Sequence, residues 1–229
     1  MEQTNFISPF SYSQHEWKLT WKRIPSNARY DRPVETQSQK EQKALEAIAS
    51  VGVIGGAQLK RIFNIDKQRL KRMVGRKLIV QHELMRGNTL IPIYTIGKHG
   101  ANKIMPQYEE NYWVKFNAEE VLKRLAFFQL YDLFDKVSIL PSPEPFVGTM
   151  SMNGNDFYVY VTRGNTEDLM MLFKWKSFSG RIIIITETLN YLKPVEAFLP
   201  GLKVRVITDQ ELKSKCLKFY HLQENMWIC

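Results

Sequence analysis

The chain has 229 residues, 44% of them hydrophobic and 12% aromatic, so it is long enough for one large or two small domains with packed cores. Its 32 Lys and Arg against 23 Asp and Glu give a net charge of +9, which favours a polyanionic partner. The absence of a long apolar run, of a secretory signal and of more than two cysteines argues against a membrane protein, a secreted disulfide scaffold and a zinc protein. We therefore expect a cytoplasmic protein without metal or cofactor.

The basic surplus lies in one segment of the chain. Residues 36–105 hold 13 Lys and Arg against 4 Asp and Glu, whereas residues 1–35 carry a net charge of +1 and residues 106–229 carry −1. Such an asymmetry is typical of a chain in which one domain contacts a polyanion. The sequence thus predicts an N-terminal arm over residues 1–35, a basic domain over residues 36–105 and a third part over residues 106–229.

Three short helices are predicted within the basic segment. Apolar residues at helical spacing indicate a helix over Gln37–Val51, which Gly52 ends. A second helix is expected over Ala57–Phe63. Asp66 is a suitable N-cap for a third helix, which we expect to run to about Gly75 with its apolar residues facing inward.

A β-hairpin is predicted after the third helix. Two runs rich in β-branched and apolar residues, Leu78–Leu84 and Thr89–Ile96, flank a strong turn signal at Arg86-Gly87-Asn88. A short helical stretch, Lys98–Met105, follows. Three helices and a hairpin are the element order of a winged helix-turn-helix, whose third helix enters the major groove of DNA. Two other interpretations remain open, a solvated basic helix and a fold that contacts a protein.

The predicted helices and hairpin supply the candidate DNA-binding side chains. Gln68 and Arg69, near the start of the third helix, are expected at base edges, because Gln pairs with adenine and Arg with guanine. The other basic residues are expected mainly at phosphates, and Arg86 at the hairpin tip is expected either in a minor groove or at a phosphate. The full candidate set is Lys60, Arg61, Lys67, Gln68, Arg69, Lys71, Arg72, Arg76 and Arg86.

The C-terminal half shows an alternation of strands and helices. Ala118–Phe134 has a broad apolar side and predicts a long amphipathic helix. Ile182–Ile185 is typical of a strand buried on both faces, so helices are expected to cover the sheet. The remaining expected elements are strands at Val137–Leu140, Phe146–Met152, Phe157–Val161, Arg181–Thr186 and Lys203–Ile207, and helices at Glu167–Lys174, Tyr191–Phe198 and Asp209–Lys215. This order indicates a small α/β domain with a mixed sheet, in a chain that is α+β overall.

Several short motifs together resemble a known family. The predicted hairpin closes with the stretch Tyr94–Ala101, a long helix follows, and then come Pro143-Glu144 and a strand that ends in Arg163-Gly164. This pattern is similar to the replication-relaxation proteins of plasmids, phages and conjugative elements of Gram-positive bacteria. The resemblance implies a DNA-binding winged helix joined to a domain with a restriction-endonuclease-like fold, and a role in replication or mobilisation.

The chain departs from this family where a nuclease would need carboxylates. Family members tend to carry a Pro-Asp pair and then Glu-x-Asp before the Arg-Gly, whereas this chain has Glu144 in the pair and Tyr160 and Thr162 on the strand. Two or more carboxylates are needed to hold Mg²⁺. We therefore expect a degenerate, non-catalytic relative with no catalytic residues; the alternative is a metal-dependent nuclease that uses Glu144, with Glu119 or Glu120.

The N-terminal arm has a two-residue period over Trp17–Trp21. It predicts an edge strand that buries two indoles against the α/β domain; the alternative is an arm that grips DNA with Lys18, Lys22, Arg23, Arg29 and Arg32.

Overall, the sequence favours a double-stranded DNA-binding protein of a mobile element, acting in replication or mobilisation or as a transcriptional regulator. We expect a homodimer, because one winged helix offers a small interface with DNA, and the α/β domain is expected to dimerise or to bind a replication or mobilisation protein. A metal-dependent nuclease and a protein-interaction module are the alternatives.

Overall fold

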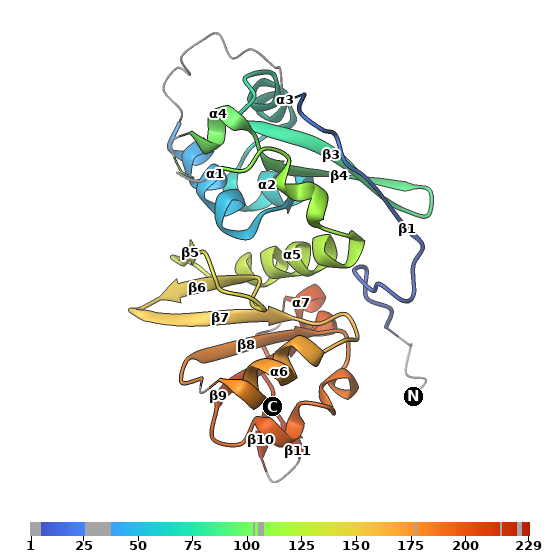
Figure 1. Cartoon of the computed structure of the whole chain (residues 1–229), viewed down its shortest axis with the longest axis vertical. Helices are drawn as coiled ribbons and strands as arrows, with labels where there is room; N and C mark the ends of the chain where they lie inside the picture. The colour runs from blue at the N-terminus through green and yellow to red at the C-terminus, as the bar shows by residue number, and fades with distance from the viewer. Residues whose placement is uncertain are drawn as a thin grey trace. The chain divides into compact units, whose positions relative to one another are not determined.

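The computed structural model describes residues 6–25, 38–102, 104, 108–176, 178–215, 217–223 and 226–229. The chain divides into two compact units (Figure 1): His15–Leu125 forms one, and Met1–Gln14 with Ala126–Cys229 forms the other. Helices and strands are both abundant, so the mixed class expected from the sequence is confirmed. Within the described ranges, no helix is long and apolar enough to cross a membrane.

This division differs from the boundaries predicted after residues 35 and 105. Residues 15–25 join the helix-and-hairpin unit because part of them forms a strand of its sheet. Asn111 joins the same unit because its side-chain amide accepts the N–H of Ile24 at 2.7 Å and donates to the carbonyl of Ile24 at 3.0 Å. The residues up to Gln14 lie with the C-terminal unit, where the hydroxyl of Ser8 donates to Asp209. Both boundaries therefore depend on contacts between distant segments.

Three helices in the first unit match the predicted ones. They are α1 (Gln39–Val51), α2 (Gly56–Phe63) and α3 (Lys67–Gly75). Asn64 ends α2 in the left-handed conformation, with φ of 54°, which Asn tolerates better than most residues. The side chain of Asp66 caps α3 by accepting the N–H three residues later at 2.7 Å. Residue 37, where the first helix was expected to begin, lies outside the described residues.

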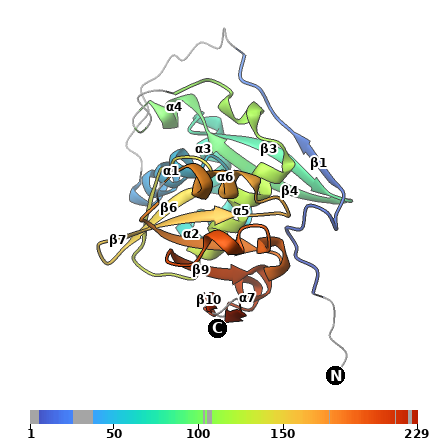
Figure 2. The same cartoon turned by 60° about the horizontal axis from the view of Figure 1, so that its bottom comes forward.

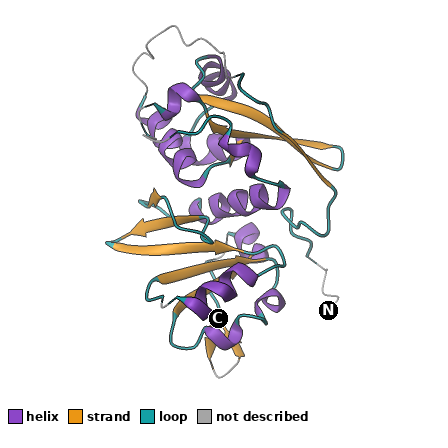
Figure 3. Ribbon diagram, in the orientation of Figure 1, coloured by secondary structure: helices purple, strands orange, loops and turns teal. Residues whose placement is uncertain are grey.

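A four-stranded antiparallel sheet completes this unit, with the strand order β1-β3-β4-β2. The predicted hairpin is present as β3 (Ile79–Arg86) and β4 (Thr89–Ile96), and Figure 3 shows its two long strands beside the three helices. Gly87 takes the first turn position at φ of 52°, which glycine adopts without steric cost. The short strand β2 (Ile54–Gly55) pairs with β4 and was not predicted.

The predicted edge strand of the N-terminal arm exists, but its predicted place was wrong. β1 (Trp17–Thr20) pairs with β3 and not with the α/β domain, and the two views show it running along β3 (Figure 1 and Figure 2). Trp21 follows it and donates its indole N–H to the carbonyl of Phe116 at 3.1 Å. A two-residue period indicates a strand but does not identify its partner. Lys18, Lys22 and Arg23 are exposed, and Arg29 and Arg32 lie outside the described residues.

The connection between the units begins with two short elements and a long helix. α4 (Lys98–Ala101) covers the first half of the helix predicted over Lys98–Met105; residues 103 and 105–107 are outside the described ranges. A 3-10 turn, η1 (Tyr112–Lys115), follows. α5 (Ala118–Tyr131) confirms the predicted amphipathic helix, and the chain passes from one unit to the other within it.

The C-terminal unit contains the mixed sheet that the sequence predicted. Its strand order is β5-β6-β7-β8-β9. The strands from β5 to β7 are antiparallel, and those from β7 to β9 are parallel. The strand bounds are β5 (Ser138–Leu140), β6 (Gly148–Met152), β7 (Asn155–Val161), β8 (Arg181–Thr186) and β9 (Lys203–Thr208).

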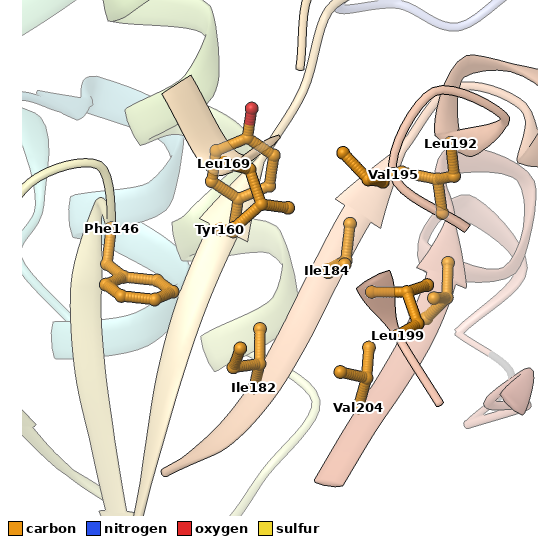
Figure 4. Packing of buried hydrophobic residues seen from close by; sticks show 10 residues of the cluster. Phe146, Tyr160, Leu169, Ile182, Ile184, Leu192, Val195, Leu199 and Val204 are labelled. Atoms are coloured by element: carbon orange, nitrogen blue, oxygen red, sulfur yellow. The ribbon is translucent and has the colours of Figure 1, made fainter. Parts of the chain in front are cut away.

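One face of this sheet carries a dense apolar core (Figure 4). Ile182 and Ile184 of β8 pack in one cluster with Leu169 of α6 (Glu167–Trp175). Ile183 and Ile185 alternate with them along the strand and are also buried, on the opposite face. The expectation that β8 is buried on both faces is therefore confirmed.

The helix predicted over Tyr191–Phe198 was wrong. The segment forms two 3-10 turns, η2 (Leu189–Leu192) and η3 (Glu196–Phe198). Pro194 lies between them, and a proline inside a helix removes a backbone donor and clashes with the preceding turn. The predicted final helix is confirmed as α7 (Asp209–Ser214), and a small hairpin, β10 (His221–Gln223) with β11 (Met226–Ile228), follows it.

Candidate nucleic-acid interface

The exposed face of α3 is formed by polar and basic side chains. Lys67, Gln68, Lys71 and Arg72 are exposed, whereas Leu70 and Met73 are buried. Residues three or four apart lie on the same side of a helix, so Lys67 lies beside Lys71 and Gln68 beside Arg72. These four side chains form one continuous strip along the helix, which we call the α3 strip.

A second part of the candidate set lies on α2. Lys60 and Arg61 are exposed in the last turn of that helix. The ion pairs formed among the described residues involve neither Lys60 nor any member of the α3 strip. The lysines and Arg72 therefore keep their charge available to a partner in solution.

Arg69 does not extend the α3 strip. Its Nε lies 3.2 Å from Oε1 of Glu41 on α1, and the side chain of Glu41 is only 8% exposed. Glu41 also accepts the backbone N–H of Ser38 at 3.1 Å, so one carboxylate caps α1 and holds α3 against it. The base-edge contact predicted for Arg69 therefore competes with an ion pair that positions the helix.

We expect Arg69→Ala to weaken this packing. Exposed ion pairs contribute roughly 0–1 kcal/mol and half-exposed ones are screened in part, so a loss of about 1 kcal/mol of unfolding free energy is expected. Urea denaturation of Arg69→Ala, Glu41→Gln and the double variant measures the coupling. The pair would have no positioning role if the two single effects simply added.

The two remaining candidates lie at the margins of this surface. Arg76 follows α3 and is half-buried, and its carbonyl is bonded to Nδ1 of His99 at 2.9 Å. Arg86 is the last residue of β3, opposite Thr89 across the hairpin turn, and is also half-buried. Both residues make further contacts within the protein. The structure thus gathers six of the nine predicted residues, Lys60, Arg61, Lys67, Gln68, Lys71 and Arg72, as exposed groups on two consecutive helices.

In the C-terminal unit, the positions at which the family carries nuclease carboxylates are occupied by hydroxyl side chains and by one exposed glutamate. Tyr160 donates its hydroxyl to Asp168 at 2.6 Å, and Thr162 donates to the carbonyl of Asn165 at 2.8 Å. Glu144 is exposed in the turn between β5 and β6. Among the described residues, no group of three or more His, Cys, Asp or Glu side chains is placed to hold a metal ion.

The two glutamates suggested as partners of Glu144 are engaged on α5. Lys123 Nζ lies 3.1 Å from both Glu119 and Glu120, and Arg124 Nη1 lies 2.6 Å from Glu120. Burial raises the pKa of Glu120, but the hydrogen bond and charge of Arg124, with Lys123, outweigh it and lower that pKa overall. Both carboxylates are thus neutralised by neighbours on their own helix.

Comparison with known proteins adds no relative: no family model, no curated protein and no solved structure matches the chain.

Proposed function

We propose that the unit His15–Leu125 binds double-stranded DNA in the manner of a winged helix-turn-helix. The observation that carries the proposal is the α3 strip, in which three cations and one amide share the exposed side of a short helix. The strip follows a capped turn and precedes a long hairpin, which is the element order of this class of DNA-binding fold.

Each part of this surface has a chemical role in the proposal. Gln68 lies in the first turn of α3, where a side chain that enters the major groove meets base edges, and its amide matches N6 and N7 of adenine. Lys67, Lys71 and Arg72 neutralise phosphates, as do Lys60 and Arg61 on α2. Arg86 lies at the end of the hairpin, where it would contact the flanking backbone.

We expect purified protein to bind duplex DNA with an affinity that falls steeply with salt. Counterion release gives a slope of log K against log salt of about −0.9 for each phosphate contacted, so five to six contacts predict roughly −5. Fluorescence anisotropy over a salt series measures the slope. Gln68→Ala should leave the salt slope unchanged, because Gln68 carries no charge. The same variant should show a weaker base-sequence preference when binding sites are selected from a random duplex pool. Salt-independent or absent binding would instead favour a protein-interaction module.

The biological role is proposed from the family that the motifs resemble. A DNA-binding protein of this kind would act in replication or mobilisation of an extrachromosomal element, or as a transcriptional regulator. We propose that it acts as a homodimer, since two-fold symmetry doubles a small interface. The C-terminal unit is proposed to be non-catalytic, supported by Tyr160 and Thr162 at the positions of the family's carboxylates. Nicking of plasmid DNA that Glu144→Ala abolished would overturn that assignment.

A further inference from the structure

A cluster of polar side chains lies at the carboxyl ends of the three parallel strands in the C-terminal unit. Arg163 comes just after β7, Glu187 after β8 and Asp209 after β9. The proposed DNA-binding surface uses none of them. The carboxyl edge of parallel strands is where α/β proteins commonly hold their ligands. We refer to these three residues as the carboxyl-edge cluster.

The guanidinium of Arg163 is completely buried but only partly bonded. Its side chain is 0% exposed, and Nη1 lies 3.1 Å from Oδ2 of Asp209 and donates to the carbonyl of Thr162 at 3.3 Å. Nε and Nη2 are buried as well, and neither has a hydrogen-bond partner among the described residues. Buried donors on a charged group are normally satisfied, since leaving them unpaired is costly.

The geometry of Nε and Nη2 indicates which chemical groups a ligand would need in order to bind both. Nε–H and the adjacent Nη2–H point in the same direction from one edge of the planar guanidinium, which matches two oxygens bonded to a single atom. Carboxylates and phosphates offer such a pair. Nη1, on another edge of the group, is the atom that contacts Asp209, so a ligand on Nε and Nη2 leaves the internal ion pair intact.

The carboxylates of the cluster are hydrogen-bonded by the N-terminal segment. The hydroxyl of Ser8 donates to Asp209, and Glu187 is bonded by the hydroxyl of Ser11 and the backbone N–H of Tyr12. Ser8 and Ser11 are both buried. Burial raises the pKa of Glu187, and Oε1 of that residue has no hydrogen-bond partner among the described residues.

From this geometry we propose that the carboxyl-edge cluster binds a small oxyanion, a phosphate or carboxylate group, through Nε and Nη2 of Arg163. The site is separate from the proposed DNA-binding surface and does not depend on it. Asp209 orients the guanidinium, and Ser8, Ser11 and Tyr12 hold the two carboxylates by hydrogen bonds. Inorganic phosphate and acetate are the two probes that distinguish the tetrahedral from the planar ligand.

The test is thermal unfolding of the full chain in each anion. Because a ligand that binds only the folded state stabilises it, the better of the two anions should raise Tm by roughly 3 °C over sodium chloride of equal ionic strength. Arg163→Lys keeps a cation for Asp209 but lacks the paired donors, so the anion-specific rise should disappear. Arg205→Lys makes the same change at an exposed arginine of β9, so it should keep the full rise and serves as the matched control.

A second variant, Glu187→Gln, tests the proposed anion site if Arg163→Lys does not fold. Glu187→Gln keeps an oxygen acceptor for Ser11 and Tyr12 but removes the negative charge, so the rise in Tm should become larger than in the unaltered chain. The proposal fails if neither anion exceeds chloride, if Arg163→Lys retains the rise, or if Glu187→Gln leaves it unchanged. The first of these results would mean that water satisfies the two donors.

Discussion

Replacing Lys67, Lys71 and Arg72 together by Ala should reduce duplex affinity by roughly 100- to 1,000-fold near 0.1 M salt, the largest effect expected for any change at the proposed interface. Each phosphate contact that is lost removes about 0.9 from the slope of log K against log salt, so the slope should fall by about 3 units. All three side chains are exposed, and none forms an ion pair among the described residues, so their removal should leave the fold intact.

The matched control removes three exposed lysines from the other unit. Lys174, Lys176 and Lys203 lie on or next to α6 and β9, so their replacement by Ala changes the net charge by the same amount. Anisotropy titrations of both triple variants over a salt series separate a local interface from the general attraction of a basic protein to DNA. Equal losses in the two variants would show that the α3 strip is not the binding surface. Circular dichroism confirms that both remain folded.

The sequence was sufficient for elements whose signals are local. The bounds of α2 and α3 follow from apolar spacing, from the cap at Asp66 and from the turn at Asn64, all within a few residues of the elements they limit. The exposure of Lys67, Gln68, Lys71 and Arg72 follows from the same helical period. The hairpin was predictable because Gly87 and its neighbours determine the turn.

Contacts between residues that are far apart in the chain could not be predicted from local sequence patterns. Nothing in residues 17–20 identifies β3 as the neighbour of β1, and the ion pair of Arg69 depends on a glutamate in another helix. The contact between Arg163 and Asp209 joins residues 46 positions apart. The sequence alone identifies Arg163 only as part of the short Arg163-Gly164 motif. Its burial, and the two donors without partners, became visible only when the strand ends were brought together.

A separate expectation concerns the stability of the first unit, which depends on a buried imidazole. His82 on β3 is 1% exposed, and its Nδ1 accepts the backbone N–H of Lys22 at 3.0 Å. That bond places the ring proton on Nε2, which donates to Thr95 at 2.8 Å. The rings of Trp21 and Trp113 lie 4.7 and 5.1 Å from the imidazole. Protonation of Nδ1 would break the bond to Lys22, which fastens the N-terminal strand segment.

Lowering the pH should therefore destabilise this unit. Burial, with the charge of Lys22 adding to it, lowers the pKa of His82 from 6.5 to about 3. Between these two values the unfolded chain binds a proton that the folded chain does not, so the contribution is complete above pH 6.5 and is lost as the pH falls toward 3. At about 1.4 kcal/mol per pH unit, roughly 3 kcal/mol of unfolding free energy should be lost between pH 7 and pH 4.5.

Urea denaturation followed by tryptophan fluorescence at pH 7 and pH 4.5 measures this loss, since Trp21 and Trp113 flank the imidazole. His82→Asn is the matched variant, because its amide oxygen replaces Nδ1 as the acceptor for Lys22 but does not titrate. The variant should be less stable at pH 7, where it lacks the bond to Thr95. Other carboxyl and imidazole groups titrate equally in both proteins and cancel in the difference. The advantage of the unaltered chain should therefore shrink by about 3 kcal/mol at pH 4.5; an advantage that stays constant with pH would show that the folded unit accepts the proton on His82 without cost.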